Sequence, residues 1–129
     1  MNGVINETIC VGIIDDDAFY TAIMIKQLER ADIKVQFNAL DGFCGIAILQ
    51  STLILPNVVI IDLEMPLMNG FDVVKNLKQA WPWLQIIAHS SITSEAVHKQ
   101  VIADGADIFV LKDGDGLKLI KAIKKLAIL

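Results

Sequence analysis

Residues 9–17 read ICVGIIDDD, a short apolar run that stops at three consecutive aspartates. A run of this length, without the alternation of a half-exposed strand, is typical of a β-strand buried on both faces. The pattern recurs at residues 58–63, where VVIIDL again carries an aspartate near its end. Strands covered on both faces belong to parallel sheets that have helices above and below them, so these two runs favour an α/β fold.

Segments with helical spacing separate the apolar runs. The expected strands cover residues 9–14, 33–37, 58–63, 84–88 and 108–111, and the expected helices cover residues 18–31, 43–50, 71–80, 94–103 and 117–126. Each strand is followed by one helix, and right-handed crossovers leave few ways to connect such units. We therefore predict a doubly wound fold in which a five-stranded parallel sheet carries helices on both faces.

Two of the expected helices have a recognisable apolar stripe. The stripe of the helix at 18–31 consists of Phe19, Ile23, Leu28 and Ala31, and Asp17 precedes it. The stripe of the helix at 117–126 consists of Leu117, Ile120, Ile123 and Leu126, opposite a row of lysines. We expect both stripes to face the sheet.

The composition fits a single folded domain. The chain has 129 residues, of which 54% are hydrophobic and 20% are charged, and disordered chains rarely carry so many apolar residues. No apolar run reaches the roughly 18 residues that a membrane helix needs. Because no linker-like or low-complexity stretch divides the chain, we predict one domain over residues 1–129, with its core at residues 8–126 and no membrane-spanning segment.

Charge and cysteine content restrict the partners and the compartment. The net charge of −4 argues against direct binding of nucleic acid, which requires clustered lysines and arginines. Residues 1–7, MNGVINE, lack the basic start and apolar stretch of a secretory signal. Cys10 and Cys44 have neither CxxC spacing nor a disulfide-rich context. We expect two buried thiols in a cytoplasmic protein. The apolar residues 126–129 make a homodimer an option that the sequence leaves open.

Polar side chains follow four of the expected strands. Asp15 and Asp16 follow the first strand and Asp62 lies at the end of the third, while Ser90 follows the fourth and Lys112 the fifth. In open parallel sheets, ligands bind beyond the carboxyl ends of the strands. We therefore expect these acids, the hydroxyl and the amine to converge on one edge of the sheet.

The chemistry of this group of side chains points to phosphoryl transfer. Three neighbouring carboxylates raise one another's pKa unless a cation is present, and Mg²⁺ suits a few carboxylates, waters and a phosphate oxygen. An aspartate beside such an ion can attack a phosphoryl group and form an acyl phosphate. A lysine ammonium and a serine hydroxyl can then hold the phosphoryl oxygens. Residue type and spacing therefore predict a Mg²⁺-assisted phosphoryl-transfer site.

Six stretches of the chain carry a more specific pattern. They are IIDDD (13–17), ALDG (39–42), IIDLEMPLMNG (60–70), AHSS (88–91), ADGAD (103–107) and FVLK (109–112). Together they resemble the receiver domain of two-component response regulators over roughly residues 8 to 126. The resemblance implies a flavodoxin-like strand order, 2-1-3-4-5.

The resemblance also implies roles for individual residues. Asp62 would be the phosphoacceptor. Asp16 would bind Mg²⁺ directly and Asp15 through water, and the backbone carbonyl of Glu64 would be the third protein ligand.

Three further positions match the switching machinery of the family. Lys112 would pair with the phosphoryl group, Ser90 would supply the switch hydroxyl, and Phe109 would be the aromatic switch residue. The implied partners are a histidine kinase or histidine phosphotransferase, and a downstream protein or output domain. Such a chain is a signalling switch that assists its own phosphorylation and dephosphorylation, not an enzyme with a separate substrate.

The sequence departs from the family pattern at two positions near the site. Asp113 follows Lys112 where the family usually has proline, which leaves the shape of that loop open. Glu64 places a carboxylate two residues beyond the acceptor, beside the path of an attacking water. We predict that Glu64 changes the lifetime of the phosphoryl group.

Two other functions remain compatible with these residues. A phosphatase of the haloacid dehalogenase type would use Asp15 as its nucleophile and Asp17 as its acid and base. Asp17 is equally well placed to cap the following helix. The second alternative is a receiver-shaped interaction module that is never phosphorylated. As for the histidines, we expect His89 to be a packed, hydrogen-bonded core residue and His98 to be an exposed helix residue.

Overall fold

The computed structural model describes residues 8–128, in which five β-strands and five α-helices alternate along the chain. The strands are β1 (Ile9–Ile14), β2 (Ile33–Ala39), β3 (Val58–Ile61), β4 (Gln85–Ser90) and β5 (Ile108–Leu111). The helices are α1 (Ala18–Arg30), α2 (Gly42–Ser51), α3 (Gly70–Ala80), α4 (Glu95–Ala103) and α5 (Gly116–Ala127). All strand pairs are parallel and the sheet order is β2-β1-β3-β4-β5, so the predicted fold and strand order are confirmed.

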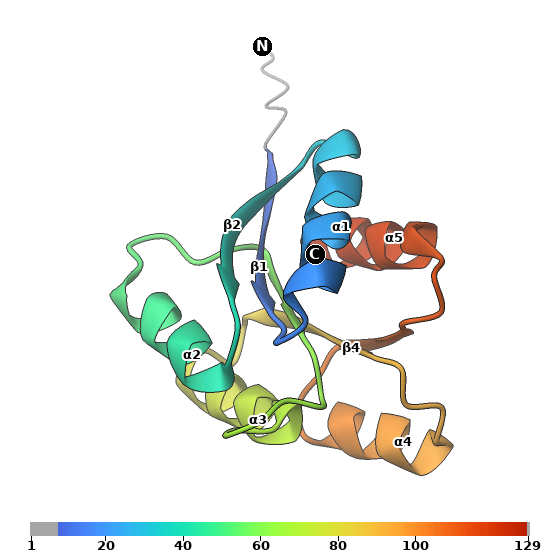
Figure 1. Cartoon of the computed structure of the whole chain (residues 1–129). Helices are drawn as coiled ribbons and strands as arrows, with labels where there is room; N and C mark the ends of the chain where they lie inside the picture. The colour runs from blue at the N-terminus through green and yellow to red at the C-terminus, as the bar shows by residue number, and fades with distance from the viewer. Residues whose placement is uncertain (1–7, 129) are drawn as a thin grey trace.

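The sheet separates two hydrophobic layers (Figure 1). Helices α1 and α5 cover one face, where Met24 and Ile123 pack with Ile13 of the sheet. Helices α2, α3 and α4 cover the other face, where Leu49 and Leu77 belong to the same buried cluster as β3 and β4. Burial on both faces explains why β1 and β3 are continuous apolar runs.

Each of the five helices begins after a polar residue whose side chain accepts a backbone N–H from the first turn. These N-cap residues are Asp17, Asp41, Asn69, Ser94 and Asp115. Such caps satisfy N–H groups that have no partner inside the helix, and each typically stabilises a helix by about 1 kcal/mol. The caps start the helices within a few residues of the strand ends, which keeps most of the loops at this edge of the sheet short.

The predicted apolar stripes of α1 and α5 were partly wrong. Phe19 and Ile23 of α1 are exposed, and so is Leu117 of α5. The buried residues of α1 are Thr21, Met24 and Leu28, and those of α5 are Leu119, Ala122, Ile123 and Leu126. Both helices have apolar residues on more than one side. Packing of each helix against the sheet and against its neighbouring helix decides which side is buried.

Three other predictions need correction. His98 is half-buried instead of exposed, because its ring packs on Phe109. Cys44 is exposed in the first turn of α2, where Gly42 faces inward, and Cys10 is only half-buried. Both cysteines are unpaired thiols, but neither belongs to the buried core.

No helix within residues 8–128 is long and apolar enough to cross a membrane. The cytoplasmic location stays a prediction. Residues 1–7, to which the expectation about a secretory signal applies, lie outside the described residues. So does Leu129, the last residue of the apolar end at 126–129.

Candidate functional site

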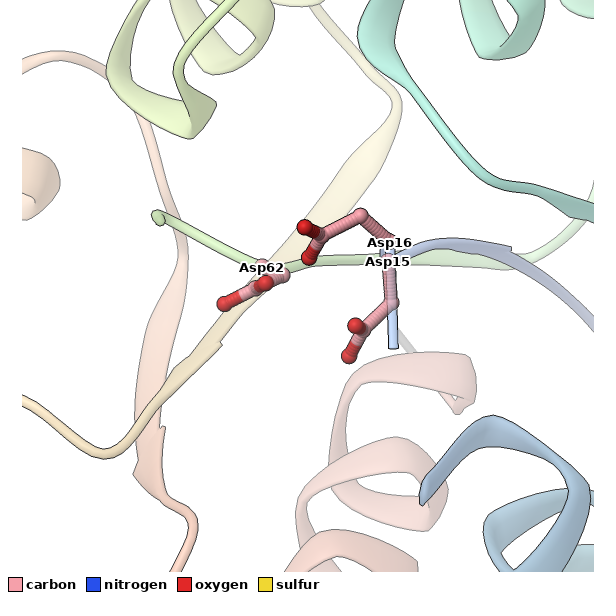
Figure 2. Close-up of side chains that lie close together, drawn as sticks. All are labelled: Asp15, Asp16 and Asp62. Atoms are coloured by element: carbon pink, nitrogen blue, oxygen red, sulfur yellow. The ribbon is translucent and has the colours of Figure 1, made fainter. Parts of the chain in front are cut away.

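The central strands place three aspartates at one edge of the sheet. The hydrogen-bond ladder continues past the strand ends: the Asp62 N–H donates to the Ile14 carbonyl over 2.9 Å, and the Asp15 N–H donates to the Ala39 carbonyl over 3.0 Å. Figure 2 shows the side chains of Asp15, Asp16 and Asp62 side by side. One carboxylate oxygen from each residue lies within 4.8 Å of the other two.

Asp62 is a buried carboxyl with a raised pKa. It is only 6% exposed, and this burial, together with the charge of Asp15, raises its pKa to about 7. Lys112 and a long hydrogen bond from the Glu64 N–H to Asp62 Oδ1 (3.4 Å) act in the opposite direction. Burial and a neighbouring negative charge therefore both disfavour the ionised form of Asp62 when no metal ion is bound.

Gly70 brings the start of α3 against the backbone of Asp62. A Cβ atom at position 70 would lie 2.1 Å from the Asp62 carbonyl oxygen, so only glycine allows this approach. The Gly70 N–H donates to the Leu63 carbonyl over 3.0 Å, which closes the loop between β3 and α3. Within that loop Leu67 has a positive φ of 69°. The MPLMNG stretch therefore forms a tight turn that fixes the position of Asp62.

Lys112 supplies the cation of the cluster. Its Nζ lies 2.9 Å from Asp15 Oδ2 and 3.5 Å from Asp62 Oδ1. Burial favours the neutral amine, but the hydrogen bond and charge of Asp15 and the charge of Asp62 outweigh burial and raise the pKa of Lys112. The ammonium therefore stays protonated at neutral pH. Its backbone N–H also donates to the Ser90 carbonyl over 2.8 Å, which ties it to β4.

The donor set suits a hard divalent cation. One ammonium faces three carboxylates, and two of the three, Asp15 and Asp62, are buried. Asp16 is exposed and free of the Lys112 ion pairs, which leaves its oxygens able to bind a metal directly. Oxygen ligands from a few carboxylates, completed by water, are what Mg²⁺ prefers. These residues therefore fit Mg²⁺.

The side chains of Ser90 and Phe109 make contacts outside this cluster. Ser90 is buried in β4, and its hydroxyl oxygen accepts from the Ile92 N–H over 3.1 Å. Phe109 is half-buried on the edge strand β5, where its ring stacks on the ring of His98 with a centroid separation of 3.7 Å. Within the described residues, the structure thus brings together Asp15, Asp16, Asp62 and Lys112. The Ser90 hydroxyl bonds to the backbone of Ile92 and not to any of these four residues.

Two acids that the sequence left open have structural roles in turns. The Asp17 carboxylate accepts from the Tyr20 N–H over 2.9 Å as the N-cap of α1, and it lies outside the three-aspartate cluster. The Asp113 carboxylate accepts from the Asp115 N–H over 3.0 Å and pairs with Lys118. Residues 8–128 contain no cis peptide bond, so the chain passes through Lys112 and Asp113 in the trans form.

One aromatic residue at this site was not predicted from the sequence. The ring of Tyr20 lies under the Lys112 ammonium, with Nζ 4.6 Å from the ring centroid, and its hydroxyl bonds to His89 Nε2 over 2.7 Å. His89 is buried and hydrogen-bonded. No local pattern marks Tyr20, because its contacts are with residues 69 and 92 positions later in the sequence.

Comparison with known proteins assigns the family. The family model of the response regulator receiver domain matches residues 11–124. The chemotaxis protein CheY of Thermotoga maritima is 28% identical over 115 residues, which cover 89% of this chain and 94% of that protein. The protein-glutamate methylesterase/protein-glutamine glutaminase 1 of Carboxydothermus hydrogenoformans is 36% identical over 116 residues, covering 88% of this chain but 33% of that protein.

Solved structures agree with this assignment. The response regulator domain of Thermotoga maritima CheB superposes with a TM-score of 0.84 at 25% identity, covering 95% of this chain and 98% of that one. The receiver domain of RcsB from Salmonella enterica superposes with a TM-score of 0.83 at 27% identity, covering 93% and 88%.

The chain belongs to the response regulator receiver domain family. Receiver domains are signalling switches of two-component pathways, which interact with histidine kinases or phosphotransferases and with output domains. Membership favours phosphoryl-accepting signal transduction over both the phosphatase and the unphosphorylated module. The chain spans most of the chemotaxis relative but only about a third of the methylesterase, whose name describes that protein and not this chain.

Proposed function

We propose that Asp62 accepts a phosphoryl group from the phosphohistidine of a partner kinase or phosphotransferase. The observation that carries this proposal is the convergence of the Asp15, Asp16 and Asp62 carboxylates within 4.8 Å, with the Lys112 ammonium 3.5 Å from Asp62 Oδ1. The chain then acts as a switch whose own side chains assist the reaction. It does not turn over a separate substrate.

The transfer is a displacement at phosphorus. A carboxylate oxygen of Asp62 attacks, the P–N bond to the donor histidine breaks, and a P–O bond forms, giving an acyl phosphate. The leaving imidazole keeps the electron pair of the P–N bond and can take up a proton. Lys112 lies close enough to shift from Asp62 Oδ1 to a phosphoryl oxygen and balance its charge.

The acidic residues around Asp62 would hold Mg²⁺. We assign Asp16 and Asp62 as direct ligands, Asp15 as a ligand through water, and the Glu64 backbone carbonyl as the remaining protein ligand. When bound, Mg²⁺ neutralises charge on the phosphoryl oxygens. The buried position of Asp15 and its hydrogen bond to Lys112 support an indirect role for this residue.

Ser90 and Phe109 would carry the signal away from the acceptor. Ser90 Oγ is the acceptor of the Ile92 N–H, and we propose that it turns toward the phosphoryl group once that group is present. Phe109 then turns inward, and the surface formed by α4, β5 and α5 changes. Both side chains belong to neighbouring strands, since Ser90 pairs with Leu111 and Ala88 with Phe109.

The partner surface for the output lies along the edge strand. An open groove of about 450 Å³ runs between β5 and α5. Its lining includes Ile108, Phe109, Lys118, Lys121 and Lys125. We propose that it binds an acidic segment of a downstream protein or output domain, because the lysines offer positive charge beside apolar surface. Inward rotation of Phe109 would reshape this groove.

Glu64 would set how long the phosphoryl group persists. Its exposed carboxylate follows Asp62 by two residues, and its N–H contacts Asp62 Oδ1. We expect Glu64→Asn to change the rate of dephosphorylation, measured by following loss of the phosphoryl mass after the donor is removed. An unchanged rate would refute this role.

The decisive experiment adds acetyl phosphate or beryllofluoride, each with Mg²⁺, to the wild type and to Asp62→Asn. We expect NMR spectra of the wild type to shift around Asp62, Ser90 and Phe109, and those of the variant to stay unchanged. Equal responses would reject Asp62 as the acceptor. Turnover of an aryl phosphate that is abolished by Asp15→Asn would instead establish the phosphatase.

A further inference from the structure

The Lys112 ammonium contacts an aromatic ring as well as the carboxylates. Its Nζ is 2.9 Å from Asp15 Oδ2 and lies over the ring of Tyr20, 4.6 Å from the centroid. A cation over an aromatic face is attracted by the ring's negative quadrupole, and the attraction strengthens when both groups are partly desolvated. Tyr20 is half-buried, so the condition for a strong contact is met.

A buried histidine holds the Tyr20 ring in place. His89 is 3% exposed, its Nδ1 lies 2.7 Å from the Val110 carbonyl oxygen, and its Nε2 lies 2.7 Å from the Tyr20 hydroxyl. A carbonyl can only accept, so we assign the hydrogen to Nδ1, and the neutral ring then accepts the Tyr20 O–H at Nε2. Burial lowers the pKa of His89, which keeps the ring neutral.

These contacts join three elements around Lys112. Tyr20 lies in the first turn of α1, His89 lies in β4, and Val110 lies in β5, two residues before Lys112. The Tyr20 N–H is itself held by the N-cap Asp17 over 2.9 Å. The Tyr20 side chain is therefore fixed at both ends, by its backbone and by its hydroxyl. The ammonium of Lys112, in contrast, is carried on a flexible four-carbon chain.

We propose that Tyr20 is a positioning residue for phosphoryl transfer, whose ring keeps the Lys112 ammonium beside Asp62 while His89 keeps the ring in place. This inference rests on the proposed role of Asp62 as acceptor. When a phosphoryl group arrives, Lys112 must move from the aspartate oxygens to a phosphoryl oxygen. A fixed aromatic surface limits that motion to positions near the reacting atoms, which reduces the entropy lost in the transition state.

The test measures the rate constant of phosphorylation by acetyl phosphate with Mg²⁺, using intact mass spectrometry on the full chain. Tyr20→Leu removes the ring, and we expect a rate about tenfold lower, in line with a partly desolvated cation–π contact. Tyr20→Phe keeps the ring but loses the hydroxyl, and we expect a loss of about two- to threefold. Ile23→Ala, one turn along α1, is the matched control and should keep the wild-type rate.

A second comparison separates ring electronics from packing. Replacement of Tyr20 by pentafluorophenylalanine keeps the shape of Tyr20→Phe but reverses the charge distribution of the ring face. We expect this protein to be about fivefold slower than Tyr20→Phe. His89→Asn keeps a donor for the Val110 carbonyl but loses the contact to Tyr20, and we expect its phosphorylation rate to fall as much as that of Tyr20→Phe. The rate of the double variant should be no lower than that of either single variant.

The outcomes distinguish the inference from the function on which it rests. Rates within twofold of each other for the phenylalanine and pentafluorophenylalanine proteins would overturn the positioning role, even if Asp62 is phosphorylated normally. Additive losses for Tyr20→Phe and His89→Asn would overturn the coupling between the two residues. A wild type that acquires no more phosphoryl groups than Asp62→Asn would overturn the proposed function itself, and the inference with it.

Discussion

The ring of His98 on α4 stacks on the ring of Phe109 on β5, with centroids 3.7 Å apart and planes 25° from parallel. His98 Nε2 also lies 2.7 Å from the Ile92 carbonyl oxygen, and the Ile92 N–H donates to Ser90 Oγ over 3.1 Å. A continuous set of contacts therefore links the Ser90 hydroxyl at the end of β4 to the Phe109 ring at the edge of the sheet. In this arrangement, inward rotation of Phe109 must break the stack.

Removal of the His98 ring should favour the activated conformation. The stack exists in the structure without a phosphoryl group, so His98→Ala destabilises this state relative to one in which Phe109 has turned inward. An aromatic pair contributes about 0.5–1.5 kcal/mol, so beryllofluoride with Mg²⁺ should bind roughly two- to tenfold more tightly. An NMR titration measures the affinity.

His98→Gln is the matched control for this experiment. A glutamine amide can still donate to the Ile92 carbonyl, but it offers no ring to Phe109. If the stack matters, His98→Gln will behave like His98→Ala. If only the hydrogen bond matters, His98→Gln will behave like the wild type, and our interpretation of the stack will be wrong.

Replacement of Leu67 should stabilise the folded protein. Its φ of 69° is in the left-handed region, which is unfavourable for leucine, and its side chain is 84% exposed, so little packing is lost. We expect Leu67→Asn or Leu67→Gly to raise the free energy of unfolding by about 1 kcal/mol in urea titrations. Leu53 is also fully exposed but has no positive φ, and Leu53→Asn should bring no gain.

The buried carboxylate of Asp62 should weaken the metal-free fold. Because burial and the charge of Asp15 raise the pKa of Asp62 to about 7, ionised Asp62 at pH 8 destabilises the folded state. We expect Asp62→Asn in EDTA to be more stable than the wild type by about 2 kcal/mol. Addition of Mg²⁺ should stabilise the wild type more than the variant, because the variant lacks one carboxylate ligand.

Asp16→Asn provides the comparison. Asp16 is exposed, so its removal should change the stability in EDTA by less than about 0.5 kcal/mol while still weakening Mg²⁺ binding. A metal-free Asp62→Asn that is less stable than the wild type would contradict the assigned electrostatics.

His89 should make the fold sensitive to mild acid. Burial lowers its pKa in the folded state below the ordinary value of 6.5. Above pH 6.5 the ring is neutral in both the folded and the unfolded chain, and its contribution to stability is complete. As the pH falls below 6.5, the unfolded chain takes up a proton that the folded chain does not, so the free energy of unfolding decreases.

A paired measurement isolates this effect from other titrating groups. Urea midpoints of the wild type and His89→Gln are compared at pH 7.5 and pH 5.5. Asp62 titrates in both proteins and largely cancels in the difference. The wild type should lose more stability than His89→Gln over this range, and an equal loss would show that His89 is not the group responsible.

Much of the fold could be predicted from the sequence. The strands at 9–14 and 108–111 have the predicted bounds. β3 ends at Ile61, two residues earlier than predicted, and β4 begins one residue later. β2 and β4 end two residues later than predicted, because backbone pairing to neighbouring strands continues there: Ala39 pairs with Ile14, and Ser90 with Leu111. That pairing depends on residues far away along the chain, and local apolar runs do not record it.

The acidic part of the site was also predictable. Asp15, Asp16, Asp62 and Lys112 all follow strands of a parallel sheet, and the topology of such a sheet brings them to one edge. Tyr20 was not predicted to take part. In the sequence it is one aromatic residue in a helix, and its role depends on the distance to a lysine 92 positions later.

The sequence by itself determined the alternation of strands and helices, the parallel sheet and the convergence of charged residues. The spacing of apolar residues and the types of residue at the strand ends are local properties, which can be read from the order of residues. Only the tertiary structure decided which sides of α1 and α5 are buried, that Tyr20 contacts Lys112, and that His98 stacks on Phe109. Each of these outcomes depends on how side chains from different elements pack. Packing energy is a property of pairs distant in sequence, and residue order alone does not specify it.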